Sequence, residues 1–152
     1  MNRRAAREVA VHLIYSTAAN GETPDFAAEQ MFEPEYFATL KDEFGLAKLY
    51  AELPDDNQRE YILALVNGVN EHMAELDSYI EKYSEGWKIG RISQIAAAVL
   101  RTAMFESMYM PDVPMASAID AAVEILKGYE EERTVKFVNG VMGSFARSEV
   151  KK

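Results

Sequence analysis

The chain has 152 residues, which is enough for one ordinary domain with a full hydrophobic core. It contains no cysteine, which excludes a disulfide framework, a thiolate zinc site and a cysteine nucleophile. The formal net charge of −9 argues against a broad nucleic-acid footprint, because affinity for phosphate depends on clustered basic side chains. Glu8 and His12 interrupt the apolar residues near the N-terminus, so we expect no secretion signal and a cytoplasmic protein.

The charge is unevenly spread. Residues 1–20 carry three arginines against one acid, a net charge of +2. Residues 21–60 carry three basic residues against eleven acids, a net charge of −8, and the remainder has ten against thirteen, a net charge of −3. This separation leaves room for a local basic patch on one part of the surface and for a basic protein partner on another.

A first helix is predicted over residues 2–17. Its apolar residues follow the spacing of a buried stripe: Ala6, Val9, Ala10, Leu13 and Ile14. Arg3, Arg4 and Arg7 lie in the first two turns, where positive charge opposes the helix dipole by about 0.3–1 kcal/mol per residue. These arginines form either a solvated basic end or an anion-binding patch, which Tyr15 would extend.

The next segment, residues 22–53, carries the weakest pattern. Asn20-Gly21 and Pro24 predict a turn, and one amphipathic helix is expected to start near Pro34. Gly45 and Pro54 bracket a second short piece, and the acid excess is that of a solvated face. A long helix is then predicted over residues 57–83, with cap signals in Pro54-Asp55-Asp56. Trp87, in the connector that follows, is interpreted as a packing plug.

The stretch from Ile92 to Met110 predicts the central helix of the fold. Only Arg101 and Glu106 are charged in it, and its apolar residues cover most sides of a helical wheel. Such a helix is buried in a core or spans a membrane. We favour the core, because a charge near the middle of a span costs roughly 2.5–3.5 kcal/mol.

Two further helices are predicted, one beginning at Pro114 and ending near Lys127, the other over residues 134–147. No strand pattern is present, so the predicted fold class is all-α. The tetrapeptide Val-Asn-Gly-Val occurs at residues 66–69 and again at 138–141, each time inside an apolar helical stripe. Glycine inside a helix costs ~1 kcal/mol against alanine, so we expect a close helix crossing at both places.

Signals of catalysis are missing from the sequence. His12 and His72 belong to no metal-ligand spacing, and there is no glycine-rich phosphate loop or nucleophile elbow. We therefore expect no enzyme activity, no metal and no cofactor.

The chain resembles the NusB family of bacterial transcription antitermination factors. Five stretches carry the resemblance: RRAAREVAVHLIY at residues 3–15, LVNGV at 65–69, WKIGRISQIAAAVLRTAMFE at 87–106, DVPMASAIDAAVEILKGY at 112–129 and KFVNGVMGSFAR at 136–147. Only about residues 20–55 lie outside it. The resemblance implies two small packed helical bundles with about six to seven helices, a NusB-like unit over residues 1–152 with halves at 1–83 and 84–152.

The resemblance also implies a function. Members of the family bind boxA-type single-stranded RNA, usually with NusE, a small-subunit ribosomal protein. That pair joins an antitermination complex on RNA polymerase and supports ribosomal RNA transcription. The family role involves no cofactor, and some members form a homodimer that masks the RNA surface.

Several residues here match the family's functional positions. Arg3, Arg4 and Arg7 match its arginine-rich RNA-binding segment, and Lys136 with Phe137 match its lysine-phenylalanine pair. Guanidinium groups can bind phosphates and an aromatic ring can hold an unstacked base, although Phe137 could equally be a core residue. Tyr15 matches a tyrosine near the NusE side, and Arg101 and Glu106 are also predicted to bind a partner.

The chain departs from the family pattern at two places. Ala96 and Ala97 stand where relatives often carry a charged pair, so an acid that some relatives use to contact NusE is missing. Arg133 stands where relatives often have an acid, and its positive charge should favour RNA.

Two alternatives stay open at this point. One is a non-catalytic NusB-like module that serves an RNA methyltransferase, which would have to be a separate chain because no catalytic domain follows Lys152. The other is a helical protein-binding domain that has lost its affinity for RNA.

Overall fold

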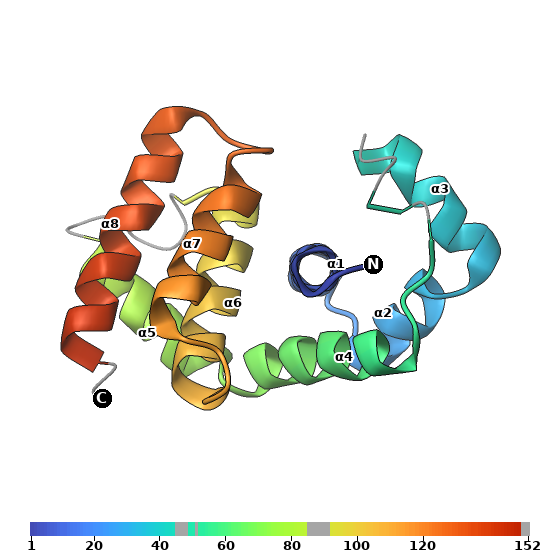
Figure 1. The fold of residues 1–152 in the computed structure, drawn as a ribbon, viewed down its shortest axis with the longest axis horizontal. Coiled ribbons are helices and arrows are strands. Elements are labelled where there is room, and N and C mark those ends of the chain that lie inside the picture. Colours follow the sequence, from blue (N-terminus) through green and yellow to red (C-terminus); the bar gives the residue numbers. More distant parts are fainter. Residues whose placement is uncertain (45–48, 51, 85–91, 150–152) are drawn as a thin grey trace. The chain divides into compact units, whose positions relative to one another are not determined.

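The computed structural model describes residues 1–44, 49–50, 52–84 and 92–149, and this part of the chain is all-α, as predicted. The described residues form eight helices, against the six to seven expected, and Figure 1 labels each of them. They are α1 (Arg3–Asn20), α2 (Pro24–Met31), α3 (Pro34–Phe44), α4 (Asp56–Glu71), α5 (Met73–Tyr83), α6 (Gln94–Tyr109), α7 (Met115–Leu126) and α8 (Glu132–Glu149).

One of the additional helices is α2, which the sequence pattern did not predict. The hydroxyl oxygen of Thr23 accepts a hydrogen bond from the Phe26 backbone N–H at 3.3 Å, and Pro24 occupies the first turn. Both are ordinary features of a helix start. The helix expected near Pro34 is confirmed as α3. The short piece expected between Gly45 and Pro54 falls largely outside the described residues, as does Trp87.

The prediction of a single long helix over residues 57–83 is wrong, because the structure has two helices there, α4 and α5. It is interrupted at His72, whose backbone dihedrals of φ −109° and ψ 17° are not helical. The Gly68 carbonyl accepts the His72 backbone N–H at 3.1 Å and also lies 2.9 Å from the His72 ring Nδ1. The His72 ring packs on the Tyr109 ring at 4.3 Å between centroids, so the break is held by side-chain contacts from α6.

The described chain divides into two compact units, residues 1–67 and residues 68–152, each with its own buried side chains. In the first unit α2 packs on α1 and on α3. Buried apolar side chains of this unit include Val9, Leu13, Ile14, Phe37, Leu40, Ile62 and Leu65. In the second unit α6 contacts α5, α7 and α8, and α7 contacts α8.

The prediction that α6 is a central buried helix is confirmed within the second unit. Every residue from Ala96 to Glu106 is buried except Arg101. Ser93 starts this helix, because its hydroxyl oxygen accepts the Ala96 backbone N–H at 3.2 Å. No helix in the described part of the chain is long and apolar enough to cross a membrane.

The two Val-Asn-Gly-Val sequences have different surroundings. A Cβ atom added at Gly68 would lie 2.0 Å from Cζ of Phe105, so the expected close crossing, of α4 with α6, is confirmed there. A Cβ atom added at Gly140 would meet no described atom within 4 Å, so the crossing expected there is wrong. Glycine is required for packing at Gly68 and not at Gly140.

These two glycines give a matched pair of variants. We expect Gly68→Ala to lower the free energy of unfolding by about 1–3 kcal/mol, the usual cost of overpacking, because the Phe105 ring must move. Gly140→Ala should raise it by up to ~1 kcal/mol, because alanine is the better helix former. Urea unfolding followed by far-UV circular dichroism measures both changes, and equal effects of the two substitutions would contradict this packing.

A buried histidine links the loop after α3 to α1 in the first unit. His12 has no exposed surface, its ring Nδ1 is hydrogen-bonded to the Tyr50 hydroxyl, and the two rings stack with centroids 5.6 Å apart. The Phe37 ring meets the Tyr50 ring edge-on at 5.1 Å. Burial lowers the pKa of His12 from 6.5 to about 4, because the charged imidazolium would lose its hydration.

This pKa makes stability depend on pH. Above pH 6.5 His12 is neutral in both the folded and the unfolded chain, and its contribution is fully present. As the pH falls from 6.5 toward 4, His12 becomes protonated in the unfolded chain while it stays neutral in the folded chain. The free energy of unfolding therefore falls by up to roughly 3 kcal/mol. The measurement is urea unfolding across this range for the wild type and His12→Gln, whose difference isolates this residue from the carboxylates. Parallel curves would contradict the assignment.

Candidate nucleic-acid interface

The first turns of α1 carry the arginines expected to bind RNA. Asn2 begins the helix, because its side-chain oxygen accepts the Ala5 backbone N–H at 2.8 Å, and no acid follows in the first turn. Arg3 and Arg4 are exposed and Arg7 is half-buried. The helix start is therefore capped by a neutral side chain, and its first two turns carry three arginines.

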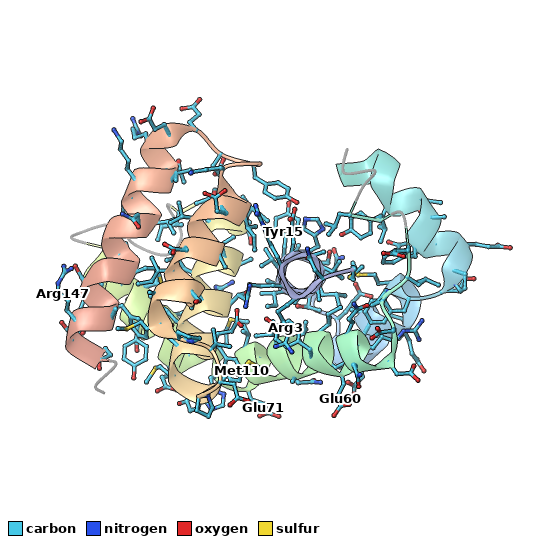
Figure 2. The ribbon with its side chains drawn as sticks, viewed as in Figure 1. Arg3, Tyr15, Glu60, Glu71, Met110 and Arg147 are labelled. Carbon is cyan, nitrogen blue, oxygen red and sulfur yellow. The ribbon has the colours of Figure 1, made fainter. Side chains whose placement is uncertain are left out.

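Arg3 is held in place by an aromatic ring of α4. Its guanidinium carbon lies 3.9 Å from the centroid of the Tyr61 ring, a cation–π contact within the first unit. Figure 2 shows Arg3 and Tyr15 as side chains of α1. A stacked guanidinium keeps its edge N–H groups available for a phosphate.

The second predicted group lies at the start of α8, in the second unit. Arg133 and Lys136 are exposed, and Phe137 is half-buried. The Lys136 ammonium lies 3.3 Å from the Glu132 carboxylate, with both side chains more than 70% exposed. Such a surface pair contributes only about 0.3–0.5 kcal/mol, so a phosphate could replace the carboxylate. The structure thus brings together the members of each predicted group within its own unit.

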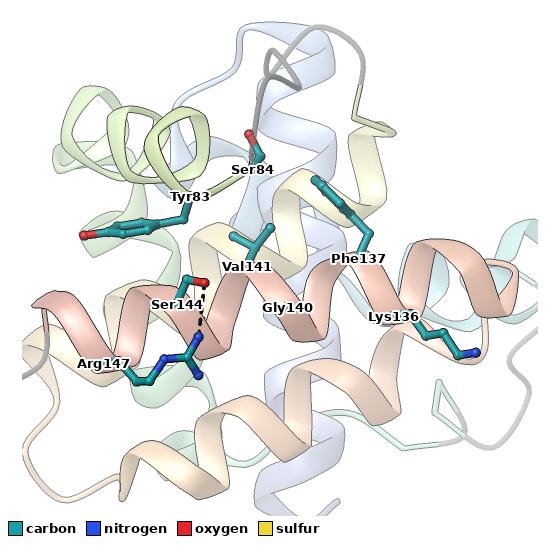
Figure 3. Close-up of a pocket in the computed structure, with 8 residues that line it drawn as sticks. All are labelled: Tyr83, Ser84, Lys136, Phe137, Gly140, Val141, Ser144 and Arg147. Atoms are coloured by element: carbon teal, nitrogen blue, oxygen red, sulfur yellow. Dashed lines mark hydrogen bonds between the residues drawn. The ribbon is translucent and has the colours of Figure 1, made fainter.

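A pocket lies beside Lys136 and Phe137, between α8 and the end of α5 (Figure 3). Its volume is about 390 Å³. The α8 side is formed by Lys136, Phe137, Gly140, Val141, Ser144 and Arg147, and the α5 side by Tyr83 and Ser84. The only charged groups among these described lining residues are the ammonium of Lys136 and the guanidinium of Arg147.

Arg147 is the functional candidate that the sequence interpretation did not single out. It is exposed near the end of α8 and donates a hydrogen bond to the Ser144 hydroxyl at 3.3 Å. A signal was present in the spacing, because Phe137, Gly140, Ser144 and Arg147 recur at helical intervals on one face. The opposite side of the pocket, which includes the Tyr83 ring, comes from a distant part of the sequence.

The three residues predicted to bind a protein partner have different placements. Tyr15 is half-buried on α1. Arg101 donates two hydrogen bonds to the carboxylate of Asp77 on α5, at 2.7 and 3.2 Å. Glu106 has no exposed surface. A partner role for these residues stays a prediction, and the geometry gives Arg101 a structural role in joining α5 to α6.

Ala96 and Ala97, where the chain departs from the family pattern, lie near the start of α6. Both alanines are buried in α6, with exposed fractions of 0% and 4%. An acidic contact of the kind expected in some relatives therefore has no counterpart at these two positions.

Comparison with known proteins identifies the family. The sequence pattern of the NusB family matches residues 4–147. A protein of Acetivibrio thermocellus named transcription antitermination protein NusB is 35% identical over 147 residues, which cover 97% of this chain and 90% of the relative. The chain belongs to the NusB family. A second relative, from Ruminiclostridium cellulolyticum and of the same name, is 35% identical over 150 residues, covering 99% of this chain and 92% of the relative.

Solved structures of NusB proteins share the fold. The chain is similar to NusB of T. maritima, with a TM-score of 0.80 and 25% identity, covering 99% of this chain and 94% of that one. It is also similar to a chain in a structure of the antitermination factors NusB and NusE in complex with double-stranded RNA. There the TM-score is 0.72, the identity is 25%, and the match covers 96% of each chain.

The ion pair of Asp77 and Arg101 can be tested by a double-mutant cycle. Their side chains are only 26% and 11% exposed, so we expect each of Asp77→Asn and Arg101→Met to destabilise the protein. The double variant should be more stable than the sum of the single effects implies, with a coupling energy of about 1–3 kcal/mol. Urea unfolding provides the four free energies, and simple additivity would show that the pair is not formed in solution.

Proposed function

We propose that this NusB-family protein is a transcription antitermination factor that binds single-stranded boxA-type RNA together with NusE. In this role it acts as an adaptor without catalytic activity. The pair of proteins then joins the antitermination complex on RNA polymerase and supports transcription of ribosomal RNA. The family membership and the relative seen with NusE and RNA support this proposal.

The observation that carries the proposal is the placement of Arg3, Arg4 and Arg7 in the first two turns of α1. Positive charge there opposes the helix dipole, which costs helix stability. Phosphate binding gives a reason for three arginines there, because arginine N–H groups bind phosphate oxygens in a fork geometry. The cation–π contact of Arg3 with Tyr61 fixes one guanidinium before RNA arrives.

The protein partner is expected on the acidic part of the surface. Residues 21–60 have a net charge of −8, and basic ribosomal proteins are attracted by such a field. A charge-driven encounter of this kind raises the association rate more than it deepens the affinity. NusE association should therefore weaken as salt is added.

The test is RNA binding by a variant with Arg3, Arg4 and Arg7 all changed to alanine. We expect its affinity for a boxA-like RNA to fall at least tenfold, because each lost phosphate contact removes about 0.7 from the salt slope of a single-stranded complex. Fluorescence anisotropy measures both quantities. A control changes the exposed Lys127, which lies outside the proposed interface, to alanine. Equal affinities of the triple variant and the wild type would refute the proposal and favour a protein-binding domain.

A second variant tests the start of α8. Arg133→Glu should weaken RNA binding without making its salt dependence steeper, because a cation beside Lys136 is replaced by an anion and no phosphate contact is gained. The dissociation constant at low salt is the measurement. An unchanged constant would exclude Arg133 from the interface.

A further inference from the structure

One of the residues that line the pocket between α5 and α8 is a glycine, so part of the pocket wall is bare helix backbone. Gly140 lies in the middle of α8, and a Cβ atom there would meet no described atom within 4 Å. A glycine in an exposed helix interior costs about 1 kcal/mol against alanine, and packing does not require it here. The backbone of this turn is therefore open to a close approach by another molecule.

Arg147 is folded back along the same face of α8. Its Nη2 donates to the Ser144 hydroxyl, and a Cβ atom at Gly143 would lie 3.2 Å from its Nη1. Glycine at position 143 thus leaves room for the guanidinium beside the helix. The hydrogen bond to Ser144 uses one of five N–H donors of the guanidinium, so the group can still bind an anion.

The two ends of the pocket are both cationic. Lys136 and Arg147 are eleven residues apart on α8, which corresponds to about 16 Å along the helix axis. Figure 3 shows them at opposite ends of the lining stretch, with Gly140 between them. A stacked nucleic-acid strand rises about 3.4 Å per nucleotide, so this length accommodates more than one.

Two aromatic rings line the pocket beside the two cations. Phe137 lines the pocket from α8 and Tyr83 lines it from α5. Tyr83 is fixed by the hydrogen bond of its hydroxyl to Glu149 and by an edge contact with the Phe145 ring at 6.3 Å. A groove that combines cations with aromatic rings is typical of single-stranded nucleic-acid binding. The volume of about 390 Å³ lies within the usual range for pockets that hold small organic groups.

We propose that this pocket holds one nucleotide of the bound single-stranded RNA, next to the part of the strand at Lys136 and Phe137. The base lies over the bare turn at Gly140, and its phosphate binds the guanidinium of Arg147. This inference rests on the proposed function and extends the RNA path along α8 toward its C-terminal end. It makes Arg147, Gly140 and Tyr83 part of the interface.

A purely structural role for Arg147 predicts something different. Arg147 lies in the last turn of α8, where any cation stabilises the helix by about 0.3–1 kcal/mol. In that case Arg147→Lys would change nothing, and the side chain at position 140 would not affect RNA. RNA affinity, measured together with the stability of each variant, therefore distinguishes RNA binding by Arg147 from a purely structural role.

The experiment combines pocket variants with RNA shortened one nucleotide at a time from each end. Gly140→Leu fills the pocket, and its matched control is Asn139→Leu, which adds the same side chain at an exposed position of α8 outside the pocket lining. Arg147→Glu is matched by Lys127→Glu at the end of α7. We expect Gly140→Leu and Arg147→Glu to raise the dissociation constant of the full boxA-like RNA roughly tenfold, with controls near wild type. Arg147→Glu should also lower the salt slope by about 0.7.

The shortened RNAs locate the nucleotide. Removing the one that occupies the pocket should weaken binding to the wild type and leave binding to Gly140→Leu unchanged. If both pocket variants bind every RNA as the wild type does while the triple arginine variant loses binding, this inference fails and the proposed function stands. If the wild type binds none of these RNAs, both fail. Thermal unfolding by circular dichroism confirms that each variant is folded.

Discussion

The burial of α6 is the constraint on which the second unit depends. Between Ala96 and Glu106 this helix exposes a side chain only partly and only at Arg101, which is itself paired with Asp77. A helix that is apolar on most sides has to be covered, and α5, α7 and α8 pack on it. The absence of a side chain at Gly68 lets α4 meet the Phe105 ring of α6. Little freedom is left in how these helices are arranged.

That arrangement decides which face of α8 is available for function. The residues Val138, Val141, Met142 and Phe145 are buried. Another face carries Gly140, Ser144 and Arg147, and it borders the pocket beside Tyr83. The same helix therefore supplies part of the core and part of the candidate RNA surface. Helix α1 is divided in the same way, because its apolar stripe is buried in the core while Arg3 and Arg4 are exposed.

Periodicity of apolar residues predicted the fold class and most helices, because a buried stripe leaves a strong signal in α1, α6 and α8. It missed α2, an eight-residue helix whose Phe26 is 49% exposed and lies off the buried stripe. It also missed the break at His72, because the apolar residues on either side continue in phase. At the break the His72 ring packs on the Tyr109 ring, a contact between distant residues that a local pattern does not contain.

The candidate site was predictable where it rests on local charge. Arg3, Arg4 and Arg7 are conspicuous because they oppose the dipole, and Lys136 and Phe137 follow from the family pattern. The pairing of Arg101 with Asp77 was not predictable, because the partner lies twenty-four positions away on another helix. The same holds for Arg147, whose importance depends on Tyr83 and on the open turn at Gly140.

The function proposed for this helical scaffold is the recognition of a particular single-stranded RNA together with NusE. The most direct test is the affinity of the unmodified protein for a boxA-like strand and for a scrambled strand of the same composition. Fluorescence anisotropy, with and without NusE and at two salt concentrations, provides the comparison. We expect selective binding of the boxA-like strand that strengthens with NusE and weakens with salt. Equal and weak binding of both strands under all conditions would contradict it.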